Sequence, residues 1–184
     1  MKGGENMLKA EETLLVVIDV QGKLAQIVDN SEEVIGNIAK IVKGANILGI
    51  PTLWLEQYPK GLGPTVETIA IEIAGQPIEK VTFSAYDTEE FRTKLEATKR
   101  KNVLLAGIET HICVYQTAAQ LLENGYHVEL LTDCVSSRTV ANRELGIGKI
   151  QAIGASVTSV EMALFEMQKV AQGDSFKAIS KVVK

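Results

Sequence analysis

Short, continuously apolar runs alternate with segments of helical periodicity along most of the chain. Residues 14–18 and 103–106 are apolar at every position, as expected for strands that are buried on both faces. Residues 32–48 follow the first run and repeat apolar side chains at helical spacing. Buried strands separated by helices predict an α/β fold, with one parallel sheet covered by helices on both faces.

The same pattern predicts the remaining elements. Strands are also expected at residues 51–55, 77–83, 102–107, 126–131 and 155–158. Helices are expected at residues 32–48, 87–99, 111–124, 139–153, 159–170 and 175–183. We expect mostly irregular chain between residues 56 and 77, and a loop at 132–138. Residues 1–184 are expected to form a single domain, with 1–12 as a loose N-terminal arm.

Composition and charge narrow the function classes. The chain of 184 residues is 46% hydrophobic and 23% charged, which is typical of a soluble globular domain. Its net charge is −4, and no basic stripe with interleaved aromatics occurs, so we expect no nucleic-acid partner. No apolar run approaches the roughly 20 residues that span a bilayer, and the start does not resemble a signal peptide. We therefore expect no membrane partner and a cytoplasmic location.

The chain contains only two cysteines, Cys113 and Cys134, and only two histidines, His111 and His127. Neither cysteine belongs to a CxxC pair, so both are expected to be free thiols in a reducing compartment. Because no HExxH motif or Cys/His cluster occurs, we expect no metal site and no cofactor. Cys134 has no basic residue evidently paired with it, and we interpret it as structural.

Three chemically active side chains follow or lie near predicted strand ends, where parallel α/β sheets carry their active sites. They are Asp19, Lys80 and Cys113. Position alone leaves other roles open: Asp19 could cap a turn, Lys80 could face solvent, and Cys113 could be a buried structural thiol. Together they supply a nucleophile, a cation to hold its thiolate, and a carboxylate to move protons.

Cys113 lies where a strand gives way to a helix. Backbone N–H groups and the helix dipole favour an anion there, so we expect a lowered thiol pKa. The same N–H groups could hold an oxyanion.

Three segments in this order carry a family resemblance: LLVVIDVQ, EKVTFSAY and GIETHICV. From about residue 14 to 170 the chain resembles the isochorismatase-like cysteine hydrolases. EQYPKGLGPTV and DCVSSR are similar to a subgroup of small, poorly characterised members. The resemblance implies a Rossmann-like, six-stranded parallel sheet and an Asp–Lys–Cys triad at Asp19, Lys80 and Cys113. It also implies a cis Ile108–Glu109 bond and an oxyanion hole formed by the N–H groups of Glu109 and Cys113.

The chain departs from its nicotinamidase relatives after the second predicted strand. Those proteins typically carry an Asp-x-His metal motif, whereas this chain reads Glu56-Gln57-Tyr58. The difference argues against a bound metal and against nicotinamide as substrate. The family commonly forms dimers, tetramers or larger rings, so the resemblance also implies a homo-oligomer.

The leading hypothesis is hydrolysis of a small amide through a thioester on Cys113. One alternative is isochorismatase-type cleavage of a vinyl ether by Asp19 and Lys80, which does not need the cysteine. Another is a non-catalytic binding or assembly protein on the same fold. The small-molecule pocket is expected to be lined by Trp54, Gln57, Tyr58, Phe83, His111 and Ile112.

Overall fold

The first apolar run forms an inner strand of one parallel sheet. In the computed structural model, which describes residues 7–184, β1 (Thr13–Ile18) is buried at all six positions. It pairs in parallel with β2 (Thr52–Gln57) and β4 (Asn102–Ile108). The remaining strands are the edge strands β3 (Ile78–Lys80) and β6 (Ser156–Thr158) and the inner strand β5 (His127–Ser136). The strand order β3-β2-β1-β4-β5-β6 confirms the predicted six-stranded α/β fold.

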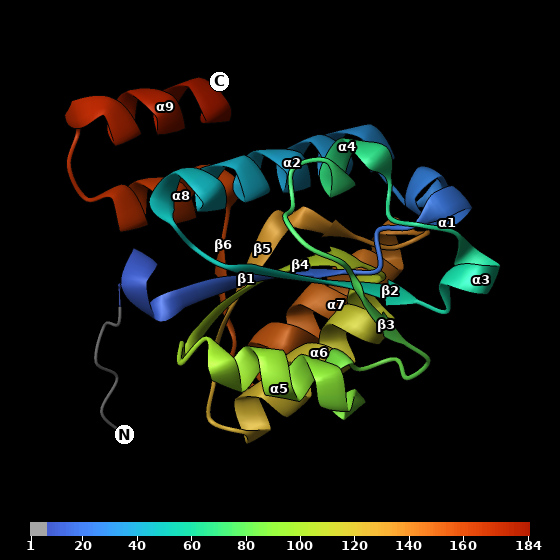
Figure 1. The fold of residues 1–184 in the computed structure, drawn as a ribbon. Helices are drawn as coiled ribbons and strands as arrows, with labels where there is room; N and C mark the ends of the chain where they lie inside the picture. The colour runs from blue at the N-terminus through green and yellow to red at the C-terminus, as the bar shows by residue number, and fades with distance from the viewer. Residues whose placement is uncertain (1–6) are drawn as a thin grey trace.

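Helices cover both faces of the sheet (Figure 1). One face carries α2 (Ser31–Leu48), α4 (Glu67–Ala70), α8 (Val160–Gln168) and α9 (Gly173–Val183). The other carries α5 (Glu89–Ala97), α6 (Tyr115–Glu123) and α7 (Val140–Ala152). Successive side chains of β1 point to opposite faces of the sheet. Leu15 and Val17 therefore pack in the first core, beneath α2 and α8, and Leu14, Val16 and Ile18 pack in the second core, beneath α5 and α6. The two cysteines separate in the same way, Cys134 into the first core and Cys113 into the second.

Strand β5 is longer than its sequence predicts. The loop expected at 132–138 is wrong over most of its length, because the strand continues to Ser136. The register of β4 against β5 shifts between Leu105 and Gly107, so that Gly107 pairs with Val135. This irregularity brings the end of β5 beside the end of β4.

Four short helices were not predicted. They are η1 (Ala10–Glu12), α1 (Gly22–Ile27), α3 (Pro59–Leu62) and η2 (Ala85–Asp87). None exceeds six residues, which is too short to produce a clear helical periodicity. Two of them, α1 and α3, contribute side chains to the candidate site.

The loose arm expected over residues 1–12 is wrong for its second half. Leu8 is 2% exposed and packs in the core with α2 and α8. Its backbone N–H donates to Glu166 Oε1 at 2.8 Å. Residues 1–6 lie outside the described residues.

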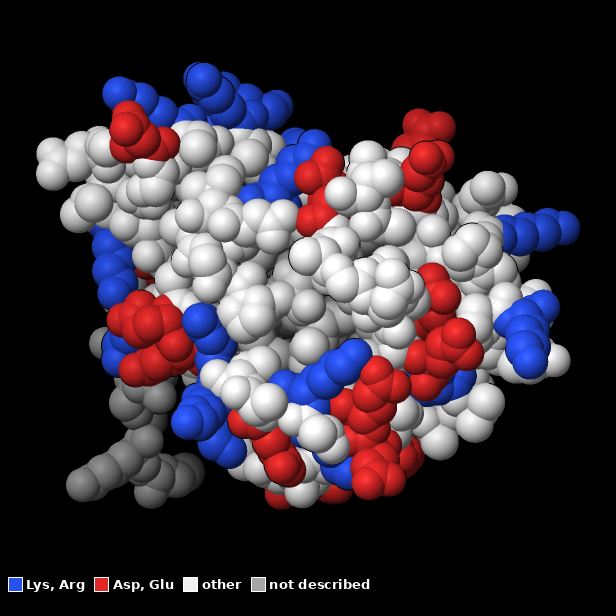
Figure 2. Space-filling model, in the orientation of Figure 1, with Lys and Arg blue, Asp and Glu red and all other residues white. Residues whose placement is uncertain are grey.

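The surface carries both signs of charge. On the face drawn in Figure 2, acidic and basic side chains are interspersed and neither forms a continuous stripe. Among residues 7–184, no helix is both long and apolar enough to cross a membrane.

Candidate active site

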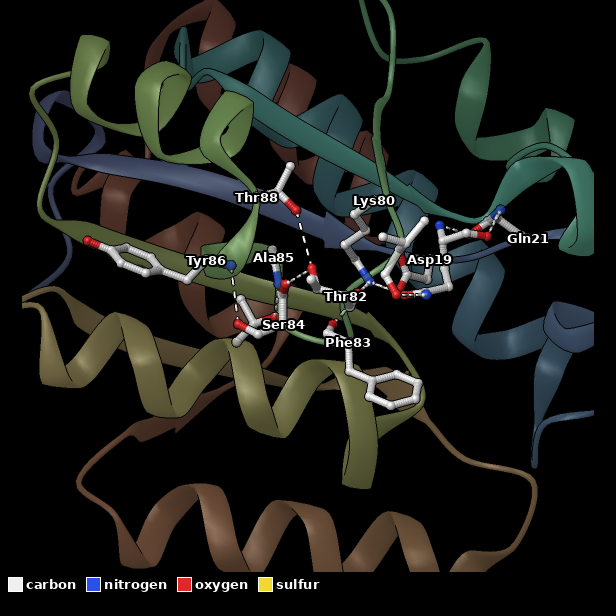
Figure 3. Close-up of polar contacts among 12 residues, drawn as sticks. Asp19, Gln21, Lys80, Thr82, Phe83, Ser84, Ala85, Tyr86 and Thr88 are labelled. Carbon is white, nitrogen blue, oxygen red and sulfur yellow. Dashed lines mark hydrogen bonds and ion pairs between the residues drawn. The ribbon is translucent and has the colours of Figure 1, made fainter.

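Asp19 and Lys80 meet beyond the carboxyl ends of their strands (Figure 3). Asp19 follows β1 directly, in the left-handed conformation with φ +52°, which aspartate tolerates better than most residues. Lys80 ends β3. Its Nζ lies 2.7 Å from Asp19 Oδ2, and the exposed fractions of the two side chains are 0% and 2%. Lys80 is therefore a buried cation and not a surface residue.

The Lys80 ammonium is surrounded by acceptors. Besides Asp19, it donates to Gln57 Oε1 at 2.6 Å and to the carbonyl oxygens of Thr82 and Phe83 at 3.0 Å. A lysine ammonium has three N–H groups, so four acceptors satisfy it without water. This arrangement fixes the charge beside Asp19 and compensates its burial.

Two glutamines hold the end of β2 against the end of β1. Gln21 is fully buried; its Oε1 accepts from the Gln57 backbone N–H at 2.6 Å, and its Nε2 donates to Gln57 O at 3.1 Å. The Gln57 side chain in turn donates to Val81 O at 2.9 Å. Gln57 thus connects the position of Lys80 to the sheet.

Close contact between β1 and β4 brings the segment that carries Cys113 near Asp19. Gly107 has φ +127°, and a Cβ atom there would lie 2.1 Å from the carbonyl oxygen of Ile18. Only glycine allows this approach. Asp19 follows Ile18 directly, so the approach brings the β4 end next to the Asp19 carboxylate.

Cys113 lies in a widened helical turn and not at the start of an α-helix. The Ile108–Glu109 peptide bond is cis, and the next five residues form a π-helix, η3 (Thr110–Val114). Helix α6 begins only at Tyr115. Cys113 is 8% exposed, at the carboxyl edge of the sheet.

The electrostatics of Cys113 differ from the sequence-based expectation. Burial and the Asp19 carboxylate together raise the pKa of the thiol to about 12, against the opposing effect of Lys80. The predicted lowering of this pKa is therefore wrong: desolvation and a neighbouring carboxylate outweigh the helix terminus. The resting sulfur is a protonated thiol.

The Asp19 carboxylate is suited to receive that proton. Burial raises its pKa, and Lys80 opposes the rise. Asp19 and Cys113 affect one another's pKa, although no hydrogen bond of ordinary geometry joins them. Oδ1 is buried without a hydrogen-bond partner among the described residues, so one oxygen remains able to accept a proton.

Glu109 is a second buried carboxylate at the site. It is 6% exposed, and its Oε1 accepts from both the backbone N–H and Nε of Arg138 at 3.0 Å. Its charge also raises the pKa of Cys113. The neighbouring His111 turns elsewhere, with Nδ1 2.9 Å from Ser137 Oγ.

Asp19, Glu109 and Cys113 line one cavity, and Lys80 lies behind Asp19. A cavity of about 120 Å³ is lined by Asp19, Leu24, Gln57, Leu62, Phe83, Ile108, Glu109, Ile112 and Cys113. Lys80 reaches Asp19 from outside this lining. Such a cavity gives a small molecule direct access to the sulfur and to the carboxylate.

Half of the predicted pocket residues line this cavity: Gln57, Phe83 and Ile112. The other three do not line it. Tyr58 lines a separate groove of about 530 Å³ with Val81 and Asp87, Trp54 is buried beside another hollow near Ala74, and His111 is hydrogen-bonded to Ser137. The sequence reasoning missed Leu24, Leu62 and Ile108. Leu24 and Leu62 belong to the short helices α1 and α3, which gave no periodic signal.

Within the described residues no group of three or more His, Cys, Asp or Glu side chains is placed to hold a metal ion. Glu56, which precedes Gln57 in the region of the nicotinamidase motif, has a structural role. Its Oε1 accepts from the Thr65 backbone N–H at 2.6 Å.

Comparisons with known proteins agree with this fold. An isochorismatase domain family model matches residues 13–162. The secreted isochorismatase effector Isc1 of Phytophthora sojae is 37% identical over 177 residues, which is 94% of this chain and 84% of that protein. The MAR1 ribonuclease structure from Caenorhabditis elegans has 35% identity and a TM-score of 0.90, covering 96% and 91% of the two chains. The Escherichia coli YcaC product, described as an octameric hydrolase of unknown specificity, has 20% identity and a TM-score of 0.92 over 98% and 91%, a likeness of fold.

Proposed function

The chain belongs to the isochorismatase family, and from this premise we propose that it is a cysteine hydrolase that cleaves the C–N bond of a small amide. One observation carries the proposal. The buried Asp19–Lys80 pair, with Nζ and Oδ2 2.7 Å apart, lies beside a cavity that the Cys113 thiol also lines. A nucleophile and a proton carrier are thereby available to one small molecule, and Lys80 compensates the charge of the proton carrier from outside the cavity.

Acylation follows from the resting protonation state. Asp19 accepts the thiol proton while the Cys113 sulfur attacks the carbonyl carbon, so no free thiolate needs to accumulate. The oxyanion is held by the backbone N–H groups of Glu109 and Cys113. When the C–N bond breaks, protonated Asp19 gives its proton to the leaving nitrogen, and an amine departs from a thioester.

Deacylation reverses the proton movements. A water molecule attacks the thioester carbon while Asp19 accepts one of its protons. The C–S bond then breaks, the carboxylic acid leaves, and the proton returns from Asp19 to the Cys113 sulfur. Throughout, Lys80 stabilises the ionised form of Asp19 and carries no proton itself.

The test is a panel of small primary amides assayed for ammonia release. We expect turnover by the wild-type protein and none by Cys113→Ala, with the fold checked by circular dichroism. Cys134→Ser, which changes the other thiol, serves as the matched control and is expected to keep turnover. Wild-type rates in Cys113→Ala would falsify the scheme.

Two alternatives give different results in the same assay. Vinyl ether cleavage by Asp19 and Lys80 predicts that Cys113→Ala remains active on such an ether. A non-catalytic binding or assembly role predicts no turnover of any amide or vinyl ether by the wild-type protein.

RNA cleavage is a further candidate because the C. elegans relative is named a ribonuclease. Two features favour amide hydrolysis over it. The cavity of about 120 Å³ is well below the roughly 300–1,000 Å³ of an ordinary ligand pocket, and the face in Figure 2 has no basic stripe such as RNA binders carry. Incubation with single-stranded RNA, beside Asp19→Asn and Cys113→Ala, tests it: cleavage by the wild type that both variants lose would favour the ribonuclease.

Self-association and location complete the proposal. A neighbouring structure is described as octameric, and Val81 and Phe83 expose 79% and 57% of their surface beside the site, so we expect a homo-oligomer. Light scattering after size exclusion measures the oligomeric state.

We expect the protein to lie in a reducing cytoplasm because both thiols are free. Since one relative is named a secreted effector, fractionation of the source cells is the check.

A further inference from the structure

The cavity at Cys113 carries negative charge without a cation of its own. Asp19 and Glu109 are among its lining residues, and no lysine or arginine is. The Lys80 ammonium lies behind Asp19, where four protein acceptors already occupy it. A substrate in the cavity therefore meets no side-chain cation able to pair with an anionic group.

Glu109 is only partly neutralised by its partner. Oε1 accepts both bonds from Arg138, and Oε2 receives no hydrogen bond from the residues that the structure describes. The Arg138 side chain is 56% exposed, so water screens its charge. The Glu109 carboxylate is buried, and its charge reaches the Cys113 sulfur.

Size and polarity limit the ligand further. A cavity of about 120 Å³ is well below the roughly 300–1,000 Å³ of an ordinary ligand pocket. Apart from Gln57, the two carboxylates and the thiol, its lining is apolar: Leu24, Leu62, Phe83, Ile108 and Ile112. These walls fit a short aliphatic acyl group.

We propose that Glu109 is a specificity-determining residue that restricts the site to small, uncharged carbonyl substrates and rejects those bearing a carboxylate. The dicarboxylate isochorismate is among the rejected compounds. The inference rests on the proposed function, since it takes Cys113 as the acyl acceptor. It deepens that function by separating neutral amides from amides with an acidic group.

The test compares two reagents of nearly equal size that alkylate Cys113, the neutral iodoacetamide and the anionic iodoacetate. Rates at Cys113 are measured by peptide mass spectrometry at one mildly alkaline pH, in the native protein and in the same protein unfolded in urea. We expect the native preference for iodoacetamide to exceed the unfolded preference about ten-fold, because a nearby charge in a partly screened site acts at that scale. Cys134 is fully buried and is followed separately by its own peptide.

Variants assign the preference to Glu109. Glu109→Gln keeps an oxygen for Arg138 and is expected to lower the native preference about ten-fold. Glu123→Gln removes an equal charge from the exposed far end of α6 and is expected to leave it unchanged. If Glu109→Gln does not fold, Arg138→Gln replaces it: loss of the exposed guanidinium is expected to increase the preference for iodoacetamide.

The outcomes separate the two proposals. The role of Glu109 is overturned if the native and the unfolded wild type show equal preferences for iodoacetamide. It is also overturned if neither Glu109→Gln nor Arg138→Gln alters the native preference. Both conclusions hold whether or not amides are hydrolysed. A preference that Glu109→Gln abolishes, together with no ammonia from any amide, would support the role of Glu109 and contradict the proposed function.

Discussion

At the scale of single residues, the site depends on opposing influences upon one carboxylate. Burial raises the pKa of Asp19, and the Lys80 ammonium at 2.7 Å lowers it. Their balance decides the pH above which Asp19 can act as a base. The same carboxylate raises the pKa of Cys113, so Asp19 both keeps the thiol protonated and is available to remove its proton.

Lys80→Met tests this balance. Without the ammonium the pKa of Asp19 rises further, so the carboxylate form appears only at higher pH. We expect the acidic limb of kcat/KM for the best amide to move to higher pH, and the maximum rate to fall about a hundred-fold or more. Lys94→Met, which removes an exposed lysine paired with Glu90, is the control and should leave the profile in place. An unmoved acidic limb in Lys80→Met would contradict the assigned role.

Asp19→Asn tests whether turnover needs Asp19 as a proton acceptor or needs only a preformed thiolate at Cys113. Loss of the negative charge lowers the pKa of Cys113 from about 12, so alkylation by iodoacetamide should begin at lower pH. Amide turnover should fall about 10²–10⁴-fold over the same range, because the base is missing. A variant whose turnover rose together with its thiolate would refute proton transfer to Asp19.

At the scale of elements, the β4–η3 segment determines where the sulfur lies. Gly107 lets β4 approach β1, and the π-helical turn carries Cys113 before α6 begins. A single glycine thus connects strand packing to the position of the Cys113 sulfur.

Gly107→Ala is expected to be severely destabilising. The added Cβ would lie 2.1 Å from a backbone oxygen at φ +127°, where neither strand can move cheaply. The free energy of unfolding in urea should fall by about 3 kcal/mol or more. Gly148→Ala is the matched control, because its Cβ meets nothing within 4 Å in helix α7, and it should gain up to about 1 kcal/mol. Equal stabilities for both variants would contradict this account.

Sequence patterns predicted the elements that have a strong local signal. The continuous apolar runs predicted β1 and β4, and helical spacing predicted α2 and α8, because burial imposes those patterns directly. The extension of β5 was missed because it depends on a register shift against β4, which no local pattern records. Asp19, Lys80 and Cys113 were singled out by strand-end position and resemblance, whereas Leu24 and Leu62 belong to helices too short to be recognised.

At the scale of the whole molecule, the N-terminal segment and the C-terminal part of the chain stabilise one another. Leu8 donates its backbone N–H to Glu166 on α8. Burial raises the pKa of Glu129 on β5 to about 7, and repulsion from the Glu166 carboxylate contributes to the rise. This side of the fold therefore holds a titrating group apart from Asp19, Lys80 and Cys113.

The pH dependence of stability should reflect Glu129. Its pKa is raised in the folded state, so its favourable contribution is complete below the ordinary value of 4.5 and is lost as pH rises through about 7. Glu129→Gln should thus raise Tm relative to wild type above pH 7 and change it little in acid. Thermal unfolding at both pH values measures this, with Glu123→Gln as the surface control. A Tm difference that is the same at both pH values would contradict the assignment.

The separation of Cys113 and Cys134 into the two cores on opposite faces of the sheet has a consequence under oxidative stress. A sulfenic acid formed by peroxide at Cys113 would find no second sulfur of the same chain within the described residues to condense with. Its recovery would require a small thiol such as glutathione entering from solvent, and without one a second equivalent of peroxide would oxidise it to the irreversible sulfinic acid.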